Sequence, residues 1–203
     1  MIQPPEYLPF PNESGRNWRQ QWLEVPALVR VLRLPETARI LEVGCGRGVA
    51  LMSLDRLLQP RRLVGVDIDP TTVGTARRAL NEERIRAEVR VADVRALPFG
   101  DEAFDVVVDF GTLFHIARAG TALSEIARVL APGGLFVHET KLSQLLSHPV
   151  RARGRRVPWD VEPRLRTRRS AGLWATRVRV GDQEPGHASA STRSRVPAPR
   201  PVG

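Results

Sequence analysis

Short apolar runs alternate with amphipathic stretches along the first two thirds of the chain. Apolar runs of strand length predict buried strands at 39–44, 62–68, 86–92, 104–110 and 134–139. Between them, apolar residues at three- and four-residue spacing predict helices at 49–59, 70–80 and 119–130. Strands that alternate with helices imply right-handed crossovers. We therefore expect an α/β fold with a doubly wound, mostly parallel, Rossmann-like sheet.

The segment before the first predicted strand has its own amphipathic pattern. Apolar residues recur at helical spacing through 17–34, at Trp18, Trp22, Val25, Val29 and Leu32. Pro26 marks a point where this helix is interrupted or restarts. We expect the helix to pack on the domain, with covering of a ligand as the alternative.

The pattern weakens after residue 140. Residues 173–180 predict one more strand, and no segment qualifies as a seventh, so we expect an incomplete C-terminal strand pair. Residues 182–203 are rich in Pro, Ser, Ala and Arg and predict a disordered tail. The expected organisation is an N-terminal helical segment at 1–37, a main domain at 38–181 and that tail.

The net charge of +9 is unevenly distributed. Residues 1–140 carry 17 Arg against 18 acidic residues, a net of −1, whereas 141–203 carry 13 Arg and one Lys against 4 acidic residues, a net of +10. The main domain thus lacks a broad electrostatic footprint for nucleic acid. An Arg-rich stretch at 151–179 with two Trp keeps a nucleic-acid substrate open as an alternative.

Composition also bears on the compartment. The single cysteine excludes an intrachain disulfide, the N-terminus has no signal-peptide pattern, and no apolar run approaches the roughly 20 residues of a transmembrane helix. We expect a cytoplasmic protein with no membrane partner. The four histidines are scattered, so no metal site is predicted.

A glycine-rich turn follows the first predicted strand in ILEVGCGRGVAL, residues 40–51. Such a turn lets the backbone approach a ligand at the carboxyl ends of the strands. A dinucleotide fingerprint has the spacing Gly-x-Gly-x-x-Gly, but Gly44 and Gly46 are followed by Gly48, one residue early. This spacing disfavours an NAD-dependent oxidoreductase.

The chain resembles the class I S-adenosylmethionine-dependent methyltransferases, most closely the type 11 domain family, over about residues 38–140. The matching motifs are Glu42 with Gly44, Gly46 and Gly48, then VGVDID, ADVRALPFGDEAFDVVV, LFHI and EIARVLAPGGLFVHE. The resemblance implies S-adenosylmethionine as cofactor, Asp67 on its ribose hydroxyls, Asp93 on its adenine amino group and Val94 beside it. It also implies a small-molecule methyl acceptor.

Each candidate has a structural alternative. Asp67 ends a strand, where a carboxylate can accept two ribose hydroxyls, while Asp69 has the position of a helix cap. Glu42 suits the cationic methionine end of the cofactor, or hydrogen-bonds the turn's own backbone. Asp93 is otherwise a turn former, and Asp109 either lines the pocket or caps a strand end.

Methyl transfer from a sulfonium depends mainly on alignment, and a hydroxyl acceptor would benefit from a base. Candidates are His115, after the fourth strand, and His138 or Glu139, at the end of the fifth. For His115 a packed side chain with one satisfied nitrogen is the favoured alternative. At most one of His138 and Glu139 reaches the site, because neighbouring strand residues point to opposite faces. Cys45 is expected to be a small packed side chain. A cofactor-binding module with an impaired, truncated substrate region is a further alternative to a methyltransferase.

Overall fold

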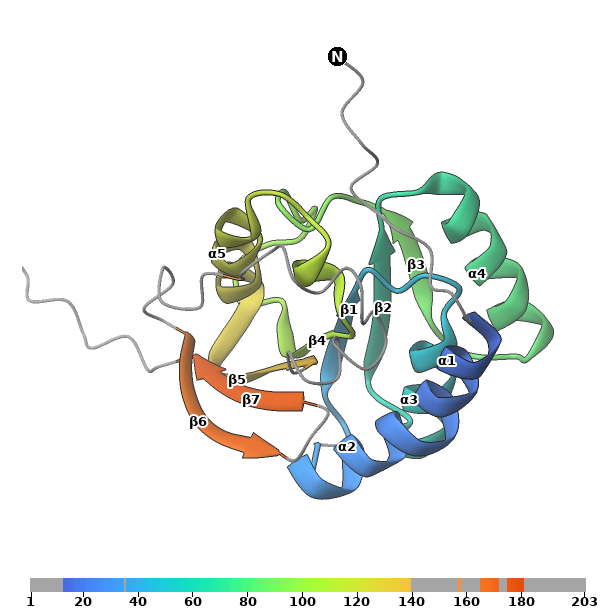
Figure 1. Cartoon of the computed structure of the whole chain (residues 1–203), viewed down its shortest axis with the longest axis horizontal. Coiled ribbons are helices and arrows are strands. Elements are labelled where there is room, and N and C mark those ends of the chain that lie inside the picture. The colour runs from blue at the N-terminus through green and yellow to red at the C-terminus, as the bar shows by residue number, and fades with distance from the viewer. Residues whose placement is uncertain (1–12, 35, 140–156, 158–164, 172–174, 181–203) are drawn as a thin grey trace, which may run out of the picture.

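A computed structural model of the chain describes residues 13–34, 36–139, 157, 165–171 and 175–180. It contains one sheet with the strand order β3-β2-β1-β4-β5-β7-β6 (Figure 1). The strands are β1 (Arg39–Val43), β2 (Arg62–Asp67), β3 (Glu88–Val91), β4 (Phe104–Asp109), β5 (Leu130–Glu139), β6 (Leu165–Ala171) and β7 (Ala175–Val180). The first five pair in parallel, and β7 runs antiparallel between β5 and β6. The predicted doubly wound, mostly parallel fold is confirmed.

The expected shortfall at the C-terminal end of the sheet is wrong. The strand predicted at 173–180 is β7, and β6 supplies the seventh strand that the sequence pattern did not reveal. The β6 sequence LRTRRSA lacks alternating apolar residues. Its pairing with β7, from Leu165 opposite Val180 to Ala171 opposite Ala175, rests on backbone hydrogen bonds, which leave no signature in side-chain hydrophobicity.

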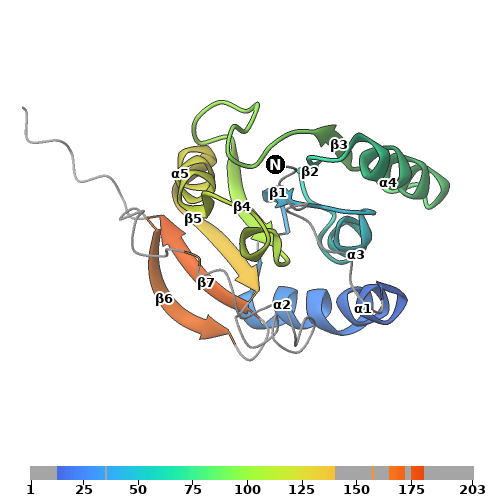
Figure 2. The ribbon, with the colours of Figure 1, turned by 45° about the horizontal axis from the view of Figure 1, so that its top comes forward.

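Helices cover both faces of the sheet, as Figure 2 shows. One face packs against α3 (Val49–Leu58), α4 (Pro70–Glu82) and the N-terminal helices, and the other packs against α5 (Ala119–Val129). Neighbouring strand residues alternate between the two cores: Ile40 points into the first and Leu41 into the second. The predicted start of α4 is confirmed, because the Asp69 carboxylate accepts hydrogen bonds from the N–H groups of Thr71 and Thr72.

The N-terminal segment is a continuous helical run: α1 (Glu13–Arg19), a π-helical turn η1 (Gln20–Glu24) and α2 (Val25–Leu32). Val25 is buried as expected, but Trp18 and Trp22 are exposed, so the predicted apolar packing face is wrong for these two residues. The reason is the π turn. Its hydrogen bonds join residues five positions apart instead of four, which rotates the residues before the turn relative to the apolar face of α2. Gln20 and Glu24 face inward instead.

None of the described helices is long and apolar enough to cross a membrane. The proposed boundaries at residues 37 and 181 stay predictions. The tail predicted at 182–203 and most of the Arg-rich stretch at 151–179 lie outside the described residues.

Candidate functional site

A cavity of about 590 Å³ lies at the carboxyl ends of the central strands. It sits where the strand order reverses, since β1 has β2 on one side and β4 on the other, and this is where open α/β sheets bind ligands. Its wall comes from three regions: the glycine turn after β1, the ends of β2, β3 and β4, and the inward side of α1 and η1. The described residues that line it include Glu42, Gly44, Cys45, Gly46, Asp67, Asp69, Asp93, Val94, Thr112 and His115.

The three glycines of the turn all have positive φ, but their surroundings differ. A Cβ on Gly44 would lie 1.8 Å from Oγ1 of Thr112, whose hydroxyl donates a hydrogen bond to the carbonyl of Val43 at 3.1 Å. A Cβ on Gly48 would lie 3.3 Å from Cδ1 of Leu80, a tight contact. A Cβ on Gly46 would meet no protein atom within 4 Å, so this glycine leaves open space in the cavity wall.

Asp67 joins the end of β2 to the glycine turn. Its Oδ2 accepts a hydrogen bond from the N–H of Gly46 at 3.0 Å, and its Oδ1 accepts one from the N–H of Asp69 at 3.0 Å. An ionised carboxylate has about four acceptor positions, so two further donors can still be bound. Asp67 thus lies in the cavity wall, oriented by the backbone and able to take both hydroxyls of a ribose.

Glu42 is a buried carboxyl group at the same cavity. The residue is 2% exposed, and its Oε2 has no hydrogen-bond partner among the described residues. Burial raises the pKa of Glu42 well above its ordinary value, while the nearby Arg16 guanidinium opposes the shift. A buried acceptor without a donor is costly, so this position favours a ligand that brings a cation or a donor.

Asp93 and Val94 lie in the cavity wall after β3, as expected from the sequence. Asp93 accepts the N–H of Arg95 at 2.8 Å, and the Arg95 guanidinium pairs with its Oδ2 at 2.8 Å. This hydrogen bonding by Arg95 lowers the pKa of Asp93. The Arg95 guanidinium therefore keeps the Asp93 carboxylate ionised, and Arg95 itself lines the cavity. The sequence analysis did not predict this role, although Arg95 follows Asp93 by only two positions.

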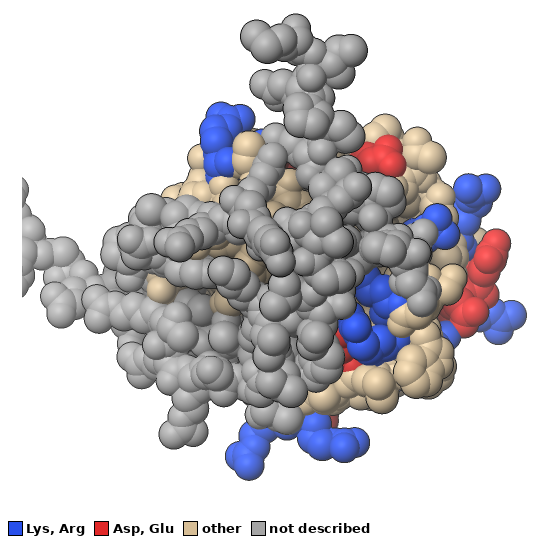
Figure 3. Space-filling view, viewed as in Figure 1, with Lys and Arg blue, Asp and Glu red and all other residues tan. Residues whose placement is uncertain are grey.

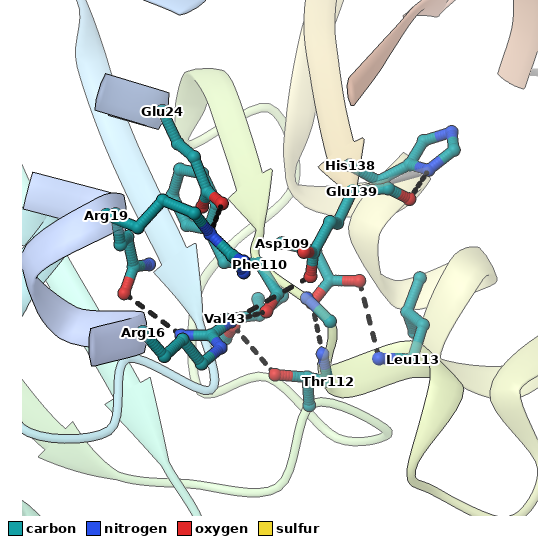
Figure 4. Close-up of polar contacts among 12 residues, drawn as sticks. Arg16, Arg19, Glu24, Val43, Asp109, Phe110, Thr112, Leu113, His138 and Glu139 are labelled. Atoms are coloured by element: carbon teal, nitrogen blue, oxygen red, sulfur yellow. Dashed lines mark hydrogen bonds and ion pairs between the residues drawn. The ribbon is translucent and has the colours of Figure 1, made fainter. Parts of the chain in front are cut away.

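Asp109 ends β4 but is not part of the cavity lining. Its carboxylate accepts backbone N–H groups from Gly111, Thr112 and Leu113 at 3.1, 2.7 and 3.3 Å (Figure 4). Burial raises the pKa of Asp109 to about 6, against the opposing effect of these hydrogen bonds. The geometry favours the alternative of a strand-end hydrogen bonder: Asp109 holds the turn that places Thr112 against Gly44.

Of the three base candidates, the described cavity wall includes His115 alone. His138 is buried, packs against the ring of Phe136 and has its Nδ1 2.9 Å from the carbonyl oxygen of Glu139. Burial lowers the pKa of His138 to about 4. The Glu139 carboxylate is also buried and lies 3.8 Å from Nη2 of Arg16. The structure therefore supports neither His138 nor Glu139 as a group facing the cavity.

Arg16 is the second cation that sequence reasoning missed. It extends from α1 into the site, where its Nη2 donates to the carbonyl of Phe110 at 2.6 Å and its Nη1 to Oε1 of Gln20 at 3.1 Å (Figure 4). Phe110 is 94 positions away, so no local pattern could have indicated this contact. Arg16, Asn17 and Gln20 line the cavity, which supports the alternative that the N-terminal helix covers a ligand.

Neither a reactive thiol nor a metal site is found among the described residues. Cys45 is buried in the glycine turn, and burial raises the pKa of its thiol, so it is a packed side chain rather than a thiolate. Among the described residues there is no group of three or more His, Cys, Asp or Glu side chains arranged to hold a metal ion.

Known proteins that resemble part of the chain are methyltransferases. Residues 41–138 match a methyltransferase domain family. The chain is 36% identical over 103 residues to a fatty-acid O-methyltransferase from Mycolicibacterium smegmatis, covering 51% of this chain and 37% of that protein. It is 34% identical to a ubiquinone biosynthesis O-methyltransferase from Maricaulis maris, covering 52% of this chain and 41% of the relative.

A solved structure extends the likeness in fold to more of the chain. The crystal structure of a SAM-dependent methyltransferase from Aquifex aeolicus superposes with a TM-score of 0.63 at 17% identity, covering 80% of this chain and 93% of that one. The chain spans less than half the length of the two curated relatives above. Residues 41–138 are thus similar to a methyltransferase domain, and the fold around them is the Rossmann-like fold of class I methyltransferases.

Proposed function

We propose that this protein binds S-adenosylmethionine and transfers its methyl group to a small-molecule acceptor. The observation that carries the proposal is the buried Oε2 of Glu42, which has no hydrogen-bond partner among the described residues. It shares one cavity with the oriented carboxylate of Asp67 and the open space over Gly46. A ligand with an ammonium group, a ribose and a planar base would satisfy these features together. A dinucleotide would bring a pyrophosphate toward Glu42 and meet repulsion.

The proposed roles follow from the positions of the side chains. Glu42 holds the amino group of the methionine part, and Asp67 holds the ribose hydroxyls. Asp93, kept ionised by Arg95, accepts the adenine amino group, with Val94 as an apolar neighbour. When bound, the cofactor supplies a methyl group on a sulfonium centre that is ready for in-line displacement. The chain's contribution is to bind, align and exclude water.

For the acceptor we propose a small molecule that is methylated on oxygen. The two curated relatives named above are O-methyltransferases of a fatty acid and of ubiquinone biosynthesis. The cavity wall also carries apolar groups from Phe110 and Ile116, close in sequence to His115. We propose His115 as the group that accepts the proton of an acceptor hydroxyl at an imidazole nitrogen. His115→Gln should then lower kcat while leaving cofactor affinity unchanged.

A truncated, impaired module is now the weaker alternative. The sequence pattern suggests such a module because it predicts no seventh strand, whereas the structure contains both β6 and β7. Nucleic acid is disfavoured because β4 continues as Asp109-Phe110-Gly111-Thr112, whereas amino-methylating nucleic-acid enzymes have Pro-Pro and an aromatic residue after the acid or amide.

The test is calorimetric titration of the full chain with S-adenosylhomocysteine, with NAD as the control ligand. We expect micromolar affinity for S-adenosylhomocysteine and no heat with NAD. Binding of neither ligand would overturn the cofactor assignment. Binding without turnover across fatty acids, quinol precursors and other hydroxyl acceptors would overturn the proposed acceptor class and leave the cofactor assignment standing.

A further inference from the structure

The outer side of the N-terminal helical segment exposes large apolar side chains. Trp18, Trp22 and Leu23 are 58%, 57% and 54% exposed, and all three lie on α1 or η1. We call these three residues the Trp face. Single exposed apolar residues are common on proteins, but three such side chains within six positions form a patch that indicates an interaction site.

Exposed arginines follow the Trp face along the helical segment. Arg30 and Arg33 are exposed on and just after α2, the helix that continues from η1. The only acidic residue in 14–34 is Glu24, which is buried and paired with Arg19 at 2.6 Å. In Figure 3, blue Arg side chains stand at the lower edge, where Figure 1 places α2. The helical segment therefore exposes aromatic rings and arginines, and its other acidic residue, Glu13, stands at the start of α1.

The inward side of the same helix belongs to the cavity. Arg16, Asn17 and Gln20 line it, while Trp18 and Trp22 on the neighbouring positions point to solvent. The helix is thus a thin wall with the cavity on one side and the Trp face on the other. Whatever contacts the Trp face lies next to the cavity.

We propose that the Trp face docks on the surface of an anionic lipid bilayer. Trp rings prefer the headgroup level of a bilayer, and arginines beside them are attracted to anionic lipids. Hydropathy alone led to the expectation of no membrane partner. A contact with the bilayer surface needs no membrane-spanning segment, so docking is compatible with that hydropathy. Docking places the cavity wall against the bilayer, where acceptors with apolar tails are dissolved. The docking itself does not depend on methyl transfer.

The test is sedimentation of the full chain with vesicles of phosphatidylcholine mixed with phosphatidylglycerol, and with vesicles of phosphatidylcholine alone. Trp18→Ala combined with Trp22→Ala should weaken binding to the anionic vesicles by about tenfold or more. Val91→Ala is the control, because Val91 is 49% exposed on the edge strand β3, outside the N-terminal helical segment, and its binding should equal that of the parent. Arg30→Gln combined with Arg33→Gln should weaken binding in low salt and have less effect in high salt.

Circular dichroism checks that the variants are folded, and Trp fluorescence of the parent gives a second readout, since burial in headgroups shifts emission to shorter wavelength. Equal binding of the double Trp variant and the parent would overturn the proposal and assign vesicle binding to another part of the chain, such as its basic C-terminal third. Light scattering without vesicles tests for a dimer. A doubled mass that is lost in the double Trp variant would also overturn the proposal, because a second copy of the chain would then cover the Trp face.

Discussion

The carboxylate of Asp67 accepts a hydrogen bond from the backbone N–H of Gly46 at 3.0 Å, across 21 positions of sequence. This bond ties the end of β2 to the one glycine of the turn that has open space above its Cα. The turn and the ribose-binding candidate are therefore one unit.

Asp67→Ala should weaken the affinity for S-adenosylhomocysteine by on the order of 10- to 100-fold, because it removes two charge-assisted hydrogen bonds. Binding of 5′-methylthioadenosine should weaken equally, since this ligand has the same ribose. The measurement is calorimetric titration of both ligands. The matched control is Asp69→Ala, whose carboxylate is used by the α4 cap: it should lower the melting temperature with little change in affinity, and the reverse pattern would reassign the ribose contact to Asp69.

Glu42→Gln should weaken binding of S-adenosylhomocysteine but leave binding of 5′-methylthioadenosine unchanged, because the second ligand lacks the amino-acid part. An equal loss for the two ligands would contradict the proposed contact with the ammonium group. Comparison of both affinities in the Glu42 and Asp67 variants separates the two ends of the cofactor.

The same Glu42→Gln variant should be more stable than the parent at neutral pH. Burial raises the pKa of Glu42, so the free energy of unfolding falls as pH rises from the ordinary carboxyl pKa to the raised value, and there is no loss below the ordinary pKa. Urea unfolding should show a gain at neutral pH that disappears in acid. A gain that persists in acid would mean that charge is not its cause.

Gly44→Ala and Gly46→Ala should differ in kind. At Gly44 the new methyl group would meet Oγ1 of Thr112 at 1.8 Å, so the turn or the β4 loop must move and stability should fall by several kcal/mol. At Gly46 the methyl group meets no protein atom, so only the left-handed backbone costs stability, about 1 kcal/mol, while the methyl group occupies ligand space.

Thermal unfolding and titration with S-adenosylhomocysteine measure the two glycine effects separately. Gly74→Ala, in α4 with open space around the new methyl group, is the control and should be neutral or slightly stabilising. Unchanged affinity in folded Gly46→Ala would show that the ligand does not approach this part of the turn.

His138 should make the fold sensitive to acid. Its pKa falls from 6.5 to about 4 on burial, so the unfolded chain takes up a proton between these values while the folded chain does not. Its contribution to stability is therefore complete above pH 6.5 and is lost as pH falls toward 4, a loss on the order of 3 kcal/mol. His138→Gln should flatten this part of the curve in urea unfolding at several pH values. His115→Gln is the matched variant, and an equal flattening by it would contradict the assignment to His138.

Local sequence patterns were enough to predict the order of strands and helices up to residue 139 and the glycine turn. They also predicted that the carboxylates Glu42, Asp67 and Asp93 lie around one cavity. These features are local: apolar periodicity predicts each element, and parallel strands bring their carboxyl ends to the same edge. The cap at Asp69 was equally local, because its acceptors and donors are within three residues.

Which side chains face the cavity and which are covered depends on the packing of distant elements. The tertiary structure placed His115 in the wall and His138 and Glu139 away from it, and it brought Arg16 from α1 to the carbonyl of Phe110. It also supplied β6, whose pairing uses backbone groups that every residue has. Sequence periodicity reports how one element divides into apolar and polar sides. Contacts such as these depend on how elements far apart in the chain pack together, and a single π turn was enough to direct Trp18 and Trp22 to solvent.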